Sequence, residues 1–278
     1  MNKDNNQIMA LIEAYRMDGL GNNFVIIDKR ENSPEINKNK IVNLANKRIL
    51  PFDQLITLEK KDGNSYPIKI FNPDGIEVAA CGNGARCVAY LISKENNQNR
   101  VTIKTSERTL NAENIGKKNI KINMGKVKFN WEEIPLSEKM NTEQVNIDFL
   151  EKEHGHGFCL NVGNPHIIFF VKNCFKISIK ELGPKIESFK YFPERVNVTF
   201  AQVLDKKNIK VNVWERGAGQ TKACGTAACA TAVAASKKGF VNKISNIHFN
   251  EGSLKIEYDN DIFMTGPVSE VKKIDLNI

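Results

Sequence analysis

Two cysteines stand at the same place in two similar phrases of the sequence. Cys81 lies in AACGNGARC (79–87) and Cys224 in KACGTAACA (222–230), 143 positions apart (224 − 81) in a chain of 278 residues. Near neutral pH, a thiolate can take a proton from carbon and a thiol can return one. The pair therefore predicts acid–base chemistry with one cysteine as base and the other as acid.

The segments that follow the two cysteines predict buried helices. Residues 85–95 (ARCVAYLISKE) and 226–238 (TAACATAVAASKK) are apolar or small on nearly all sides. A helix start offers N–H groups and partial positive charge, which stabilise a thiolate and bind a carboxylate. The glycine after each cysteine lets a ligand approach the backbone. We therefore expect a cofactor-free racemase or epimerase that acts on a carbon next to a carboxylate.

The similarity extends beyond the cysteines and indicates an internal repeat. With a shift of 142–143 residues, three pairs of segments align in order: GNNFVIID (21–28) with GNPHIIFF (163–170), FDQLITL (52–58) with RVNVTFA (195–201), and FNPDGIEVAACGNGA (71–85) with WERGAGQTKACGTAA (214–228). The alignment places three pairs of polar residues at matching positions: Asn22 with Asn164, Gln54 with Asn197, and Asn72 with Glu215. The chain is therefore expected to contain two copies of one fold.

Alternating apolar and polar runs, separated by Asn, Asp and Gly, predict strands in both halves. These runs cover 24–28, 66–71, 100–105, 119–125, 158–163, 166–171, 195–204, 208–215, 246–250, 253–259 and 261–266. The expected fold is α+β (α/β), with two pseudo-symmetric domains, each a mostly antiparallel sheet or barrel curled around a central helix. We place the domains at 1–130 and 131–264, with 1–12 as a flexible extension and 265–278 as a tail that can pack back on the first domain.

Composition argues against several other classes of protein. The formal net charge is +8, but the lysines are scattered singly and in pairs, which is typical of a solvated surface. A nucleic-acid-binding protein, our second hypothesis, would leave the cysteine phrases unexplained. No nucleotide-binding fingerprint is evident. No apolar run reaches the roughly 20 residues of a membrane span, and the N-terminus lacks a secretory signal pattern. These features predict a cytoplasmic protein with neither nucleic acid nor membrane as a partner.

The six cysteines do not resemble a disulfide framework. The spacings C-x5-C and C-x4-C place neither motif's cysteines on one helix face, which makes zinc chelation within a motif poor. A metal-binding or redox protein is therefore the third hypothesis, and no metal site is expected. The remaining cysteines are interpreted as small buried hydrophobic residues: Cys87, Cys159, Cys174 and Cys229.

The sequence closely resembles the diaminopimelate epimerase family. The matching phrases are GLGNNF (19–24), FDQL (52–55), FNPDG (71–75), CGNGARC (81–87), GNPH (163–166), PERVNV (193–198), ERGAGQTKACGTAACA (215–230) and TGP (265–267). The family interconverts LL- and meso-diaminopimelate without pyridoxal phosphate, in lysine and peptidoglycan-precursor synthesis. Its fold has two pseudo-symmetric domains with the active site between them. The alternative is another racemase or isomerase of the same fold, similar to proline racemase and acting on a different amino acid.

The resemblance also implies roles for individual residues. It makes Cys81 and Cys224 the catalytic acid–base pair, with the reacting carboxylate held by N–H groups of Gly82, Asn83, Gly225 and Thr226. Asn22 and Gln54 would lie near the reacting end of the substrate. The residues expected to hold the substrate, chiefly its distant end, are Asn72, Asn164, Asn197, Glu215 and Arg216. His166 and Glu215 would tune the pKa values of the cysteines.

A substrate with an amino-acid group at each end fits these residue types. The planar cation of Arg216 suits a distant carboxylate, while Glu215 and Asn72 offer oxygens to a distant ammonium. The sequence departs from the family pattern at Asn23, Gln220 and Ala227, none of which is a proposed binding side chain. The tail PVSEVKKIDLNI lacks a tyrosine that many members carry and that is associated with dimer contact. A homodimer that needs no cofactor is still expected.

Overall fold

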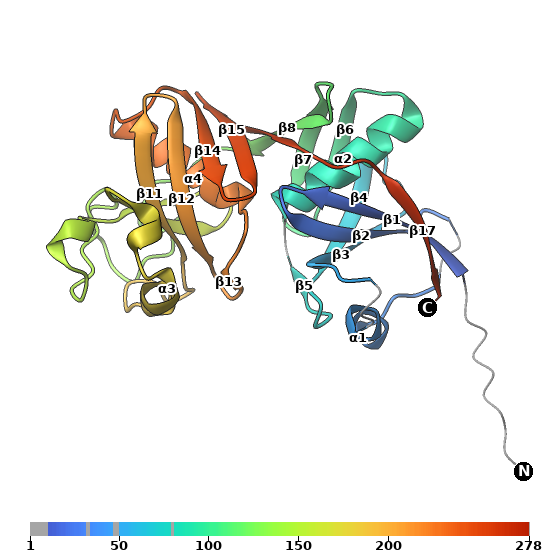
Figure 1. Cartoon of the computed structure of the whole chain (residues 1–278), viewed down its shortest axis with the longest axis horizontal. Helices are drawn as coiled ribbons and strands as arrows, with labels where there is room; N and C mark the ends of the chain where they lie inside the picture. Colours follow the sequence, from blue (N-terminus) through green and yellow to red (C-terminus); the bar gives the residue numbers. More distant parts are fainter. Residues whose placement is uncertain (1–10, 32–33, 47–49, 79–80, 278) are drawn as a thin grey trace, which may run out of the picture. The chain divides into compact units, whose positions relative to one another are not determined.

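The computed structural model describes residues 11–31, 34–46, 50–78 and 81–277. The chain forms two compact units, Met1–Ile120 together with Val268–Ile278, and Lys121–Pro267 (Figure 1). The extension expected over residues 1–12 falls mainly on residues 1–10, which lie outside the described residues. Leu11 and Ile12 begin the first strand.

The first unit is a mixed sheet around one long helix. Its strands lie in the spatial order β17 (Lys272–Asn277), β1 (Leu11–Gly19), β2 (Asn22–Asp28), β3 (Gln54–Leu58), β4 (Ser65–Phe71), β6 (Arg100–Lys104) and β7 (Thr109–Asn114). The pairs β2–β3 and β4–β6 are parallel and the others antiparallel. The short β5 (Glu77–Val78) forms a hairpin with β4. Helix α2 (Gly82–Asn96) contacts β1, β2, β3, β6 and β7, so it fills the middle of the unit.

The second unit repeats this arrangement. Its strands lie in the order β9 (Phe158–Asn161), β10 (Pro165–Phe170), β11 (Asn197–Asp205), β12 (Asn208–Glu215), β14 (Ile244–Phe249), β15 (Gly252–Tyr258), β16 (Ile262–Pro267) and β8 (Asn119–Gly125). The pairs β10–β11 and β12–β14 are parallel, and β13 (Gly219–Gln220) forms a hairpin with β12. Helix α4 (Gly225–Lys237) contacts every strand from β9 to β12 and from β14 to β16.

Six consecutive strands correspond in the two units, β1, β2, β3, β4, β6 and β7 in the first with β9, β10, β11, β12, β14 and β15 in the second. Phe24 lies opposite Gln54 in the β2–β3 pair, and His166 lies opposite Asn197 in the β10–β11 pair. The parallel pairs occupy the same places in both sheets, and each central helix follows a short hairpin. The expected fold class is confirmed: a sheet-dominated α+β structure made of two pseudo-symmetric halves, each with a central helix.

The sequence of each central helix suits its buried position. Every residue of α2 from Asn83 to Ser93 is buried, and α4 buries an almost continuous run of small residues from Ala227 to Ala235. Small side chains let strands approach the helix from several sides. Gly239 (φ 69°) follows α4, and the Phe240 N–H returns to the Ala235 carbonyl at 2.9 Å, which ends the helix in the usual left-handed cap.

Two further helices were not predicted from the sequence. Helix α1 (Lys38–Asn46) precedes β3 in the first unit, and α3 (Ile179–Glu187) precedes β11 in the second. Helix α3 contains Gly183 and Pro184, which disfavour a helix interior. It forms because Ile179 and Ile186 are buried against the core of the unit. Short 3-10 turns at Lys152–His154 and Cys174–Lys176 complete the second unit.

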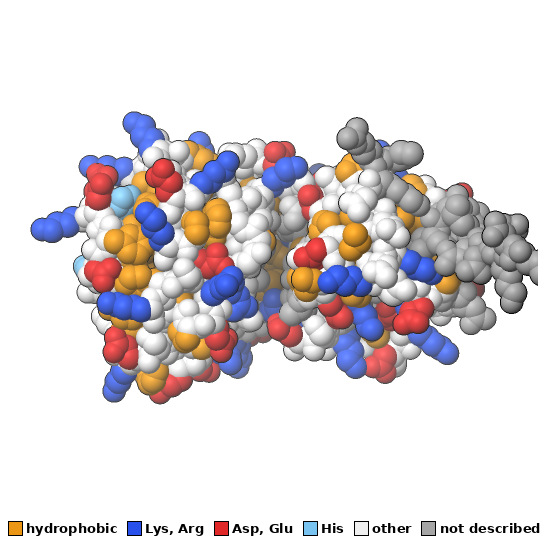
Figure 2. All heavy atoms as spheres, turned by 90° about the horizontal axis from the view of Figure 1, so that it is seen from below, with side chains coloured by type: hydrophobic (Ala, Val, Ile, Leu, Met, Phe, Trp, Pro, Cys, Tyr) orange, Lys and Arg blue, Asp and Glu red, His pale blue; other side chains and the backbone are white. Residues whose placement is uncertain are grey.

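The surface agrees with the interpretation of the net charge. On the face seen in Figure 2, Lys and Arg side chains are interspersed with Asp and Glu and do not form a continuous basic stripe. In the part of the chain that the structure describes, no helix is both long enough and apolar enough to cross a membrane.

Candidate active site

Cys81 occupies the N-cap of α2. Its backbone is extended (φ −140°, ψ 110°), and its Sγ accepts a hydrogen bond from the Gly84 N–H at 3.4 Å. The residue is half-buried, whereas the other five cysteines are buried. The N–H groups of Gly82 and Asn83 lie in the first turn, where an α-helix does not use its own N–H donors. The helix start therefore favours negative charge at and near this sulfur.

Close packing fixes the start of α2. A Cβ added at Gly84 would lie 2.7 Å from Ile56 Cδ1, so β3 approaches the helix as closely as glycine allows. A Cβ added at Gly19 would lie 3.1 Å from the Asn83 carbonyl oxygen. Gly19 pairs with Asn22 across the β1–β2 turn. The predicted site residue Asn22 thus lies beside the start of α2.

Gln54 and Asn72 are brought together by the β3–β4 pair. The Gln54 Nε2 donates to Asn72 Oδ1 at 3.2 Å. Asn72 opens the turn into β5, where its N–H donates to the Ile76 carbonyl at 2.9 Å. The Gln54 Oε1 is buried and has no hydrogen-bond partner among the described residues. Since buried acceptors are rarely unpaired, this oxygen is available for a donor on a ligand.

Cys224 occupies the N-cap of α4 in the same extended conformation (φ −128°, ψ 115°). Unlike Cys81 it is buried, at 5% exposure. Burial raises its pKa well above the usual value, and the charge of Glu215 raises it further. The Thr226 hydroxyl and the Ala227 N–H act in the opposite direction because they hydrogen bond to the anionic sulfur. Cys224 is therefore a protonated thiol in this environment.

The carboxyl group of Glu215 is enclosed even though the residue as a whole is partly exposed. Burial raises its pKa, while hydrogen bonds from the Thr221 hydroxyl and from Cys224 lower it. The Cys224 S–H can donate to this carboxylate, so the two groups compete for one proton. Thr221 was not predicted as a site residue. Its nearness to a glutamate six positions earlier depends on the β12–β13 hairpin, which no local pattern revealed.

A directed chain of hydrogen bonds leads from His166 to the Cys224 sulfur. His166 Nε2 lies 2.9 Å from Asn164 Oδ1. Because this amide oxygen can only accept, His166 Nε2 carries the proton and donates it. Asn164 Nδ2 donates to Thr226 Oγ1 at 3.3 Å. The hydroxyl proton of Thr226 is then left to donate to Cys224 Sγ, 3.4 Å away. This chain delivers a hydrogen-bond donor to the sulfur without adding a charge.

His166 is neutral in this chain. Burial, together with the smaller effect of the nearby positive charge of Arg216, lowers its pKa to about 3. Its Nδ1 is buried and has no hydrogen-bond partner among the described residues. His166 can therefore influence the cysteine by orienting Asn164 and, through it, Thr226, rather than as an imidazolium.

Arg216 is displayed on the turn that follows β12. Its backbone N–H donates to Asn197 Oδ1 at 3.0 Å, and its Nη1 donates to the Glu194 carbonyl at 3.1 Å. Asn197 is buried, and its Nδ2 donates to the Pro165 carbonyl at 2.8 Å. Asn197 was expected to hold substrate. In this structure its amide holds the backbone that carries Arg216.

The structure links the predicted residues in three groups. In the first unit, Asn22 lies beside the helix start formed by Cys81, Gly82 and Asn83, and Gln54 is hydrogen-bonded to Asn72. The second unit brings together Asn164, His166, Asn197, Glu215, Arg216, Cys224, Gly225 and Thr226. In both units the cysteine caps the central helix at its N-terminal end.

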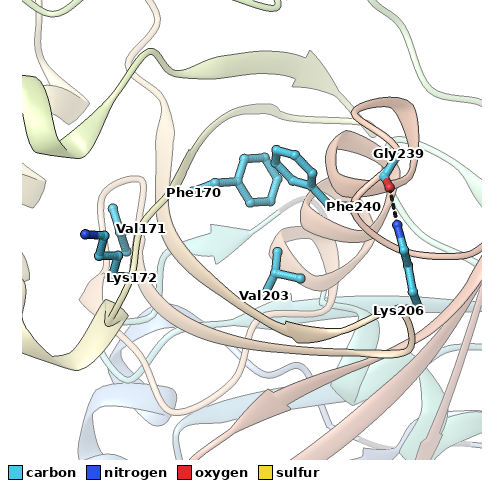
Figure 3. Close-up of a pocket in the computed structure, with 7 residues that line it drawn as sticks. All are labelled: Phe170, Val171, Lys172, Val203, Lys206, Gly239 and Phe240. Atoms are coloured by element: carbon cyan, nitrogen blue, oxygen red, sulfur yellow. Dashed lines mark hydrogen bonds between the residues drawn. The ribbon is translucent and has the colours of Figure 1, made fainter.

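A separate pocket lies at the opposite end of α4. Its volume is about 390 Å3, and it is lined by Phe170, Val171, Lys172, Val203, Lys206, Gly239 and Phe240 (Figure 3). The rings of Phe170 and Phe240 meet edge to face at 5.1 Å, and Lys206 Nζ donates to the Gly239 carbonyl at 2.8 Å. The 13 residues of α4 separate this pocket from Cys224. None of the predicted site residues lines it, so it belongs to no part of the candidate site.

Solved structures share this fold at low sequence identity. The chain is similar to a phenazine biosynthesis protein of the PhzF family from Enterococcus faecalis, with a TM-score of 0.71, 13% identity, and coverage of 97% of this chain and 100% of that one. It is also similar to a hydroxyproline epimerase from Agrobacterium vitis, with a TM-score of 0.63, 11% identity, and coverage of 96% and 93%. At this level of identity the likeness concerns the fold alone.

Sequence relatives are much more similar. A family profile described as diaminopimelate epimerase matches residues 14–130 and 158–271. A protein named diaminopimelate epimerase from Pelagibacter ubique is 45% identical over 96% of this chain and 99% of its own length. One of the same name from a Wolbachia of Brugia malayi is 41% identical over 94% and 99%. The chain belongs to the diaminopimelate epimerase family.

Proposed function

We propose that the chain is a cofactor-independent epimerase that interconverts LL- and meso-diaminopimelate, in lysine and peptidoglycan-precursor biosynthesis. The single observation that carries the mechanism is the repeated placement of a cysteine at the extended N-cap of a buried helix, Cys81 in one unit and Cys224 in the other. Inversion at carbon needs two proton-transfer groups, and a duplicated fold supplies two of the same kind. Membership of the family supports the same activity.

The proposed reaction is a proton transfer on each face of the α-carbon. The thiolate of one cysteine takes the α-proton, and the electrons of the broken C–H bond move into the adjacent carboxylate, which gains negative charge. N–H groups at the two helix starts, from Gly82, Asn83, Gly225 and Thr226, stabilise that charge. The thiol of the other cysteine then gives its proton to the opposite face. Thiol and thiolate have exchanged places, which prepares the enzyme for the reverse reaction.

The surroundings of the two sulfurs favour opposite protonation states. Burial and Glu215 hold the pKa of Cys224 high, so Cys224 is the proton donor of the resting enzyme. Cys81 is half-buried and receives the Gly84 N–H, so it is the proton acceptor. When Cys224 acts as the base in the reverse reaction, the Thr226 hydroxyl is already oriented to stabilise its thiolate.

Polar groups on both units match the two ends of diaminopimelate. The unpaired Gln54 Oε1 is suited to the α-ammonium group of the reacting end. Arg216 offers a fixed cation to the distant carboxylate, with Glu215, Asn72 and Asn164 near the distant ammonium. A substrate with a single amino-acid group, as in the proline-racemase-like alternative, has no distant charges for Arg216 and Glu215 to bind.

We also propose that the enzyme acts in the cytoplasm, without cofactor or metal, as a homodimer. The two thiols and the helix starts supply the base, the acid and the charge stabilisation that the reaction requires. The homodimer rests on the family resemblance, and sedimentation equilibrium of the purified chain would test it.

A solvent-exchange experiment tests the proposed activity. The purified chain is incubated with LL-diaminopimelate in D2O with no added cofactor. We expect the meso isomer to form and to carry solvent deuterium at the inverted α-carbon, as read by NMR and chiral chromatography. L-Proline and 4-hydroxyproline serve as comparison substrates and should show no exchange. Exchange into proline but not diaminopimelate would favour the alternative, and no exchange into any substrate by folded protein would refute both.

A further inference from the structure

Glu187 lies at the end of α3, outside every predicted group of site residues, and yet it contacts the turn that displays Glu215 and Arg216. Its Oε2 accepts the indole N–H of Trp214 at 2.7 Å. Its Oε1 accepts the backbone N–H of Gly217 at 2.8 Å. One carboxylate therefore holds the chain on both sides of the two charged residues.

The carboxylate of Glu187 is placed for this purpose by its own surroundings. The side chain is 9% exposed, and its nearest cation, Arg195 Nη1, is 3.6 Å away. The Glu187 carbonyl accepts the Val196 N–H at 3.1 Å, which ties the end of α3 to the start of β11. Both carboxylate oxygens are thus committed to N–H donors of the turn, and the residue has little freedom to move.

Helix α3 also fixes the indole ring that Glu187 holds. A Cβ added at Gly183 would lie 2.6 Å from both Cγ and Cδ2 of Trp214. The helix therefore contacts the ring at a distance that no other residue type permits. Because Trp214 lies two residues before Arg216, a fixed ring also restrains the backbone that leads into the turn.

In the matching turn of the first unit, the hydrogen bonds of the described residues include none to a carboxylate on a separate helix. The turn after β4 is closed by hydrogen bonds among its own residues. The Gly75 N–H donates to the Asn72 carbonyl at 2.8 Å, and the Ile76 N–H donates to Asp74 Oδ1 at 2.9 Å. It packs on the start of α1, where a Cβ at Gly75 would lie 2.6 Å from Lys38 Cγ. A turn that displays a neutral amide is held locally, whereas the turn that displays two charges is held from a separate helix.

We propose that Glu187 is a positioning residue that presents Arg216 in one orientation and so determines how tightly the enzyme holds the distant end of its substrate. The carboxyl group of Glu215 is held separately, by the Thr221 hydroxyl and by Cys224. This inference rests on the proposed function of Arg216. Glu187 itself contacts neither a cysteine nor Arg216 side-chain atoms in the described contacts, so it acts through the backbone of the turn. Its loss should weaken binding of the substrate rather than slow proton transfer.

The test compares kcat and KM of three variants for LL-diaminopimelate. In Glu187→Gln only one oxygen remains, and the new amide faces an N–H donor, so one anchor of the turn is lost. We expect KM to rise about tenfold with kcat within about threefold of wild type, the pattern of lost ground-state binding. Trp214→Phe removes the indole donor and part of the ring that packs on Gly183, so it weakens the other anchor and should raise KM at least about threefold. Glu181→Gln, an exposed glutamate of the same helix, should match wild type.

The KM value separates positioning from a general loss of stability. A merely destabilised enzyme has fewer active molecules, which lowers the apparent kcat and leaves KM unchanged. A folded Glu187→Gln with wild-type KM would overturn the proposal. If that variant does not fold, a wild-type KM in Trp214→Phe would overturn it instead. Failure of the wild-type chain to epimerise diaminopimelate would refute the proposed function itself, and is recognised before any variant is compared.

Discussion

The two cysteines share a backbone position but not an environment. Cys81 is half-buried, and its sulfur accepts a backbone N–H of its own helix. Cys224 is buried beside a carboxyl group and at the end of a hydrogen-bond chain that begins at His166. The repeated fold provides two equivalent helix starts, and the side chains around them then differ. The comparison shows that the repeated fold supplies two acid–base groups. The different side chains around the two sulfurs then determine which cysteine holds the proton.

The strongest way to break this comparison is to remove each sulfur in turn. Cys81→Ala and Cys224→Ala should each lower the rate of net epimerisation about a thousandfold, because inversion needs a proton-transfer group on both faces. The measurement is conversion of LL- to meso-diaminopimelate. Cys229→Ala, which alters a buried cysteine of α4 outside the candidate site, is the control and should remain active. Substantial epimerisation by either single variant would contradict the pairing.

A sharper distinction comes from the charge of Glu215. Glu215→Gln removes the carboxylate that raises the pKa of Cys224, so this pKa should fall and the thiolate should form at lower pH. Alkylation by iodoacetamide, which requires the thiolate, should then begin at lower pH at Cys224 and stay unchanged at Cys81. Mass spectrometry of the two peptides across pH 6–10 measures both. Epimerase activity should drop about thirtyfold or more, since a buried charged partner is lost.

The alkylation profile also has a clear negative outcome. At the alkaline pH where a thiol of raised pKa titrates, Glu215 is ionised, and its charge opposes the formation of a second negative charge on Cys224. If the profile of Cys224 does not move in Glu215→Gln, the carboxylate does not control this cysteine. Glu251→Gln, at an exposed glutamate of the same unit, is a matched control for loss of one negative charge.

The smallest effect is expected at Thr226. Thr226→Ala removes the hydroxyl that links Asn164 to the Cys224 sulfur and should lower kcat about fivefold, as for one hydrogen bond. Thr226→Ser keeps the hydroxyl and should recover most of that loss. The loss should be larger in the direction in which Cys224 acts as the base, because the hydroxyl stabilises only the thiolate. Equal losses in alanine and serine variants would show that the methyl group matters and the hydrogen-bond chain does not.

Much of the fold could be predicted from the sequence because the internal repeat is detectable in the aligned segments of its two halves. The helix starts at Cys81 and Cys224, and the strands at 66–71 and 119–125, lie where the patterns predicted them. Helix α3 was missed because Gly183 and Pro184 break the local pattern, while its stability comes from burial in the core. Propensity is local, and tertiary packing overrides it.

The candidate site was predictable in its residues but not in their connections. The family resemblance pointed to His166, but not to its uncharged state, which depends on burial and on the charge of Arg216. Glu187 and Thr221 gave no signal, because a single glutamate at a helix end or a threonine in a hairpin resembles any surface residue. Only the sheet register brings them to the turn at 215–217 and to the carboxyl group of Glu215.

The pairing of β17 with β1 has a consequence for how the protein is made. The first unit borrows its outer strand from a segment that follows the whole second unit in the chain. A ribosome must therefore translate every residue of the second unit before the edge of β1 can be covered. Until then the edge of β1 exposes unpaired backbone N–H and C=O groups that can pair with other nascent chains. Pairing with β17 covers this edge and so protects the first unit against aggregation.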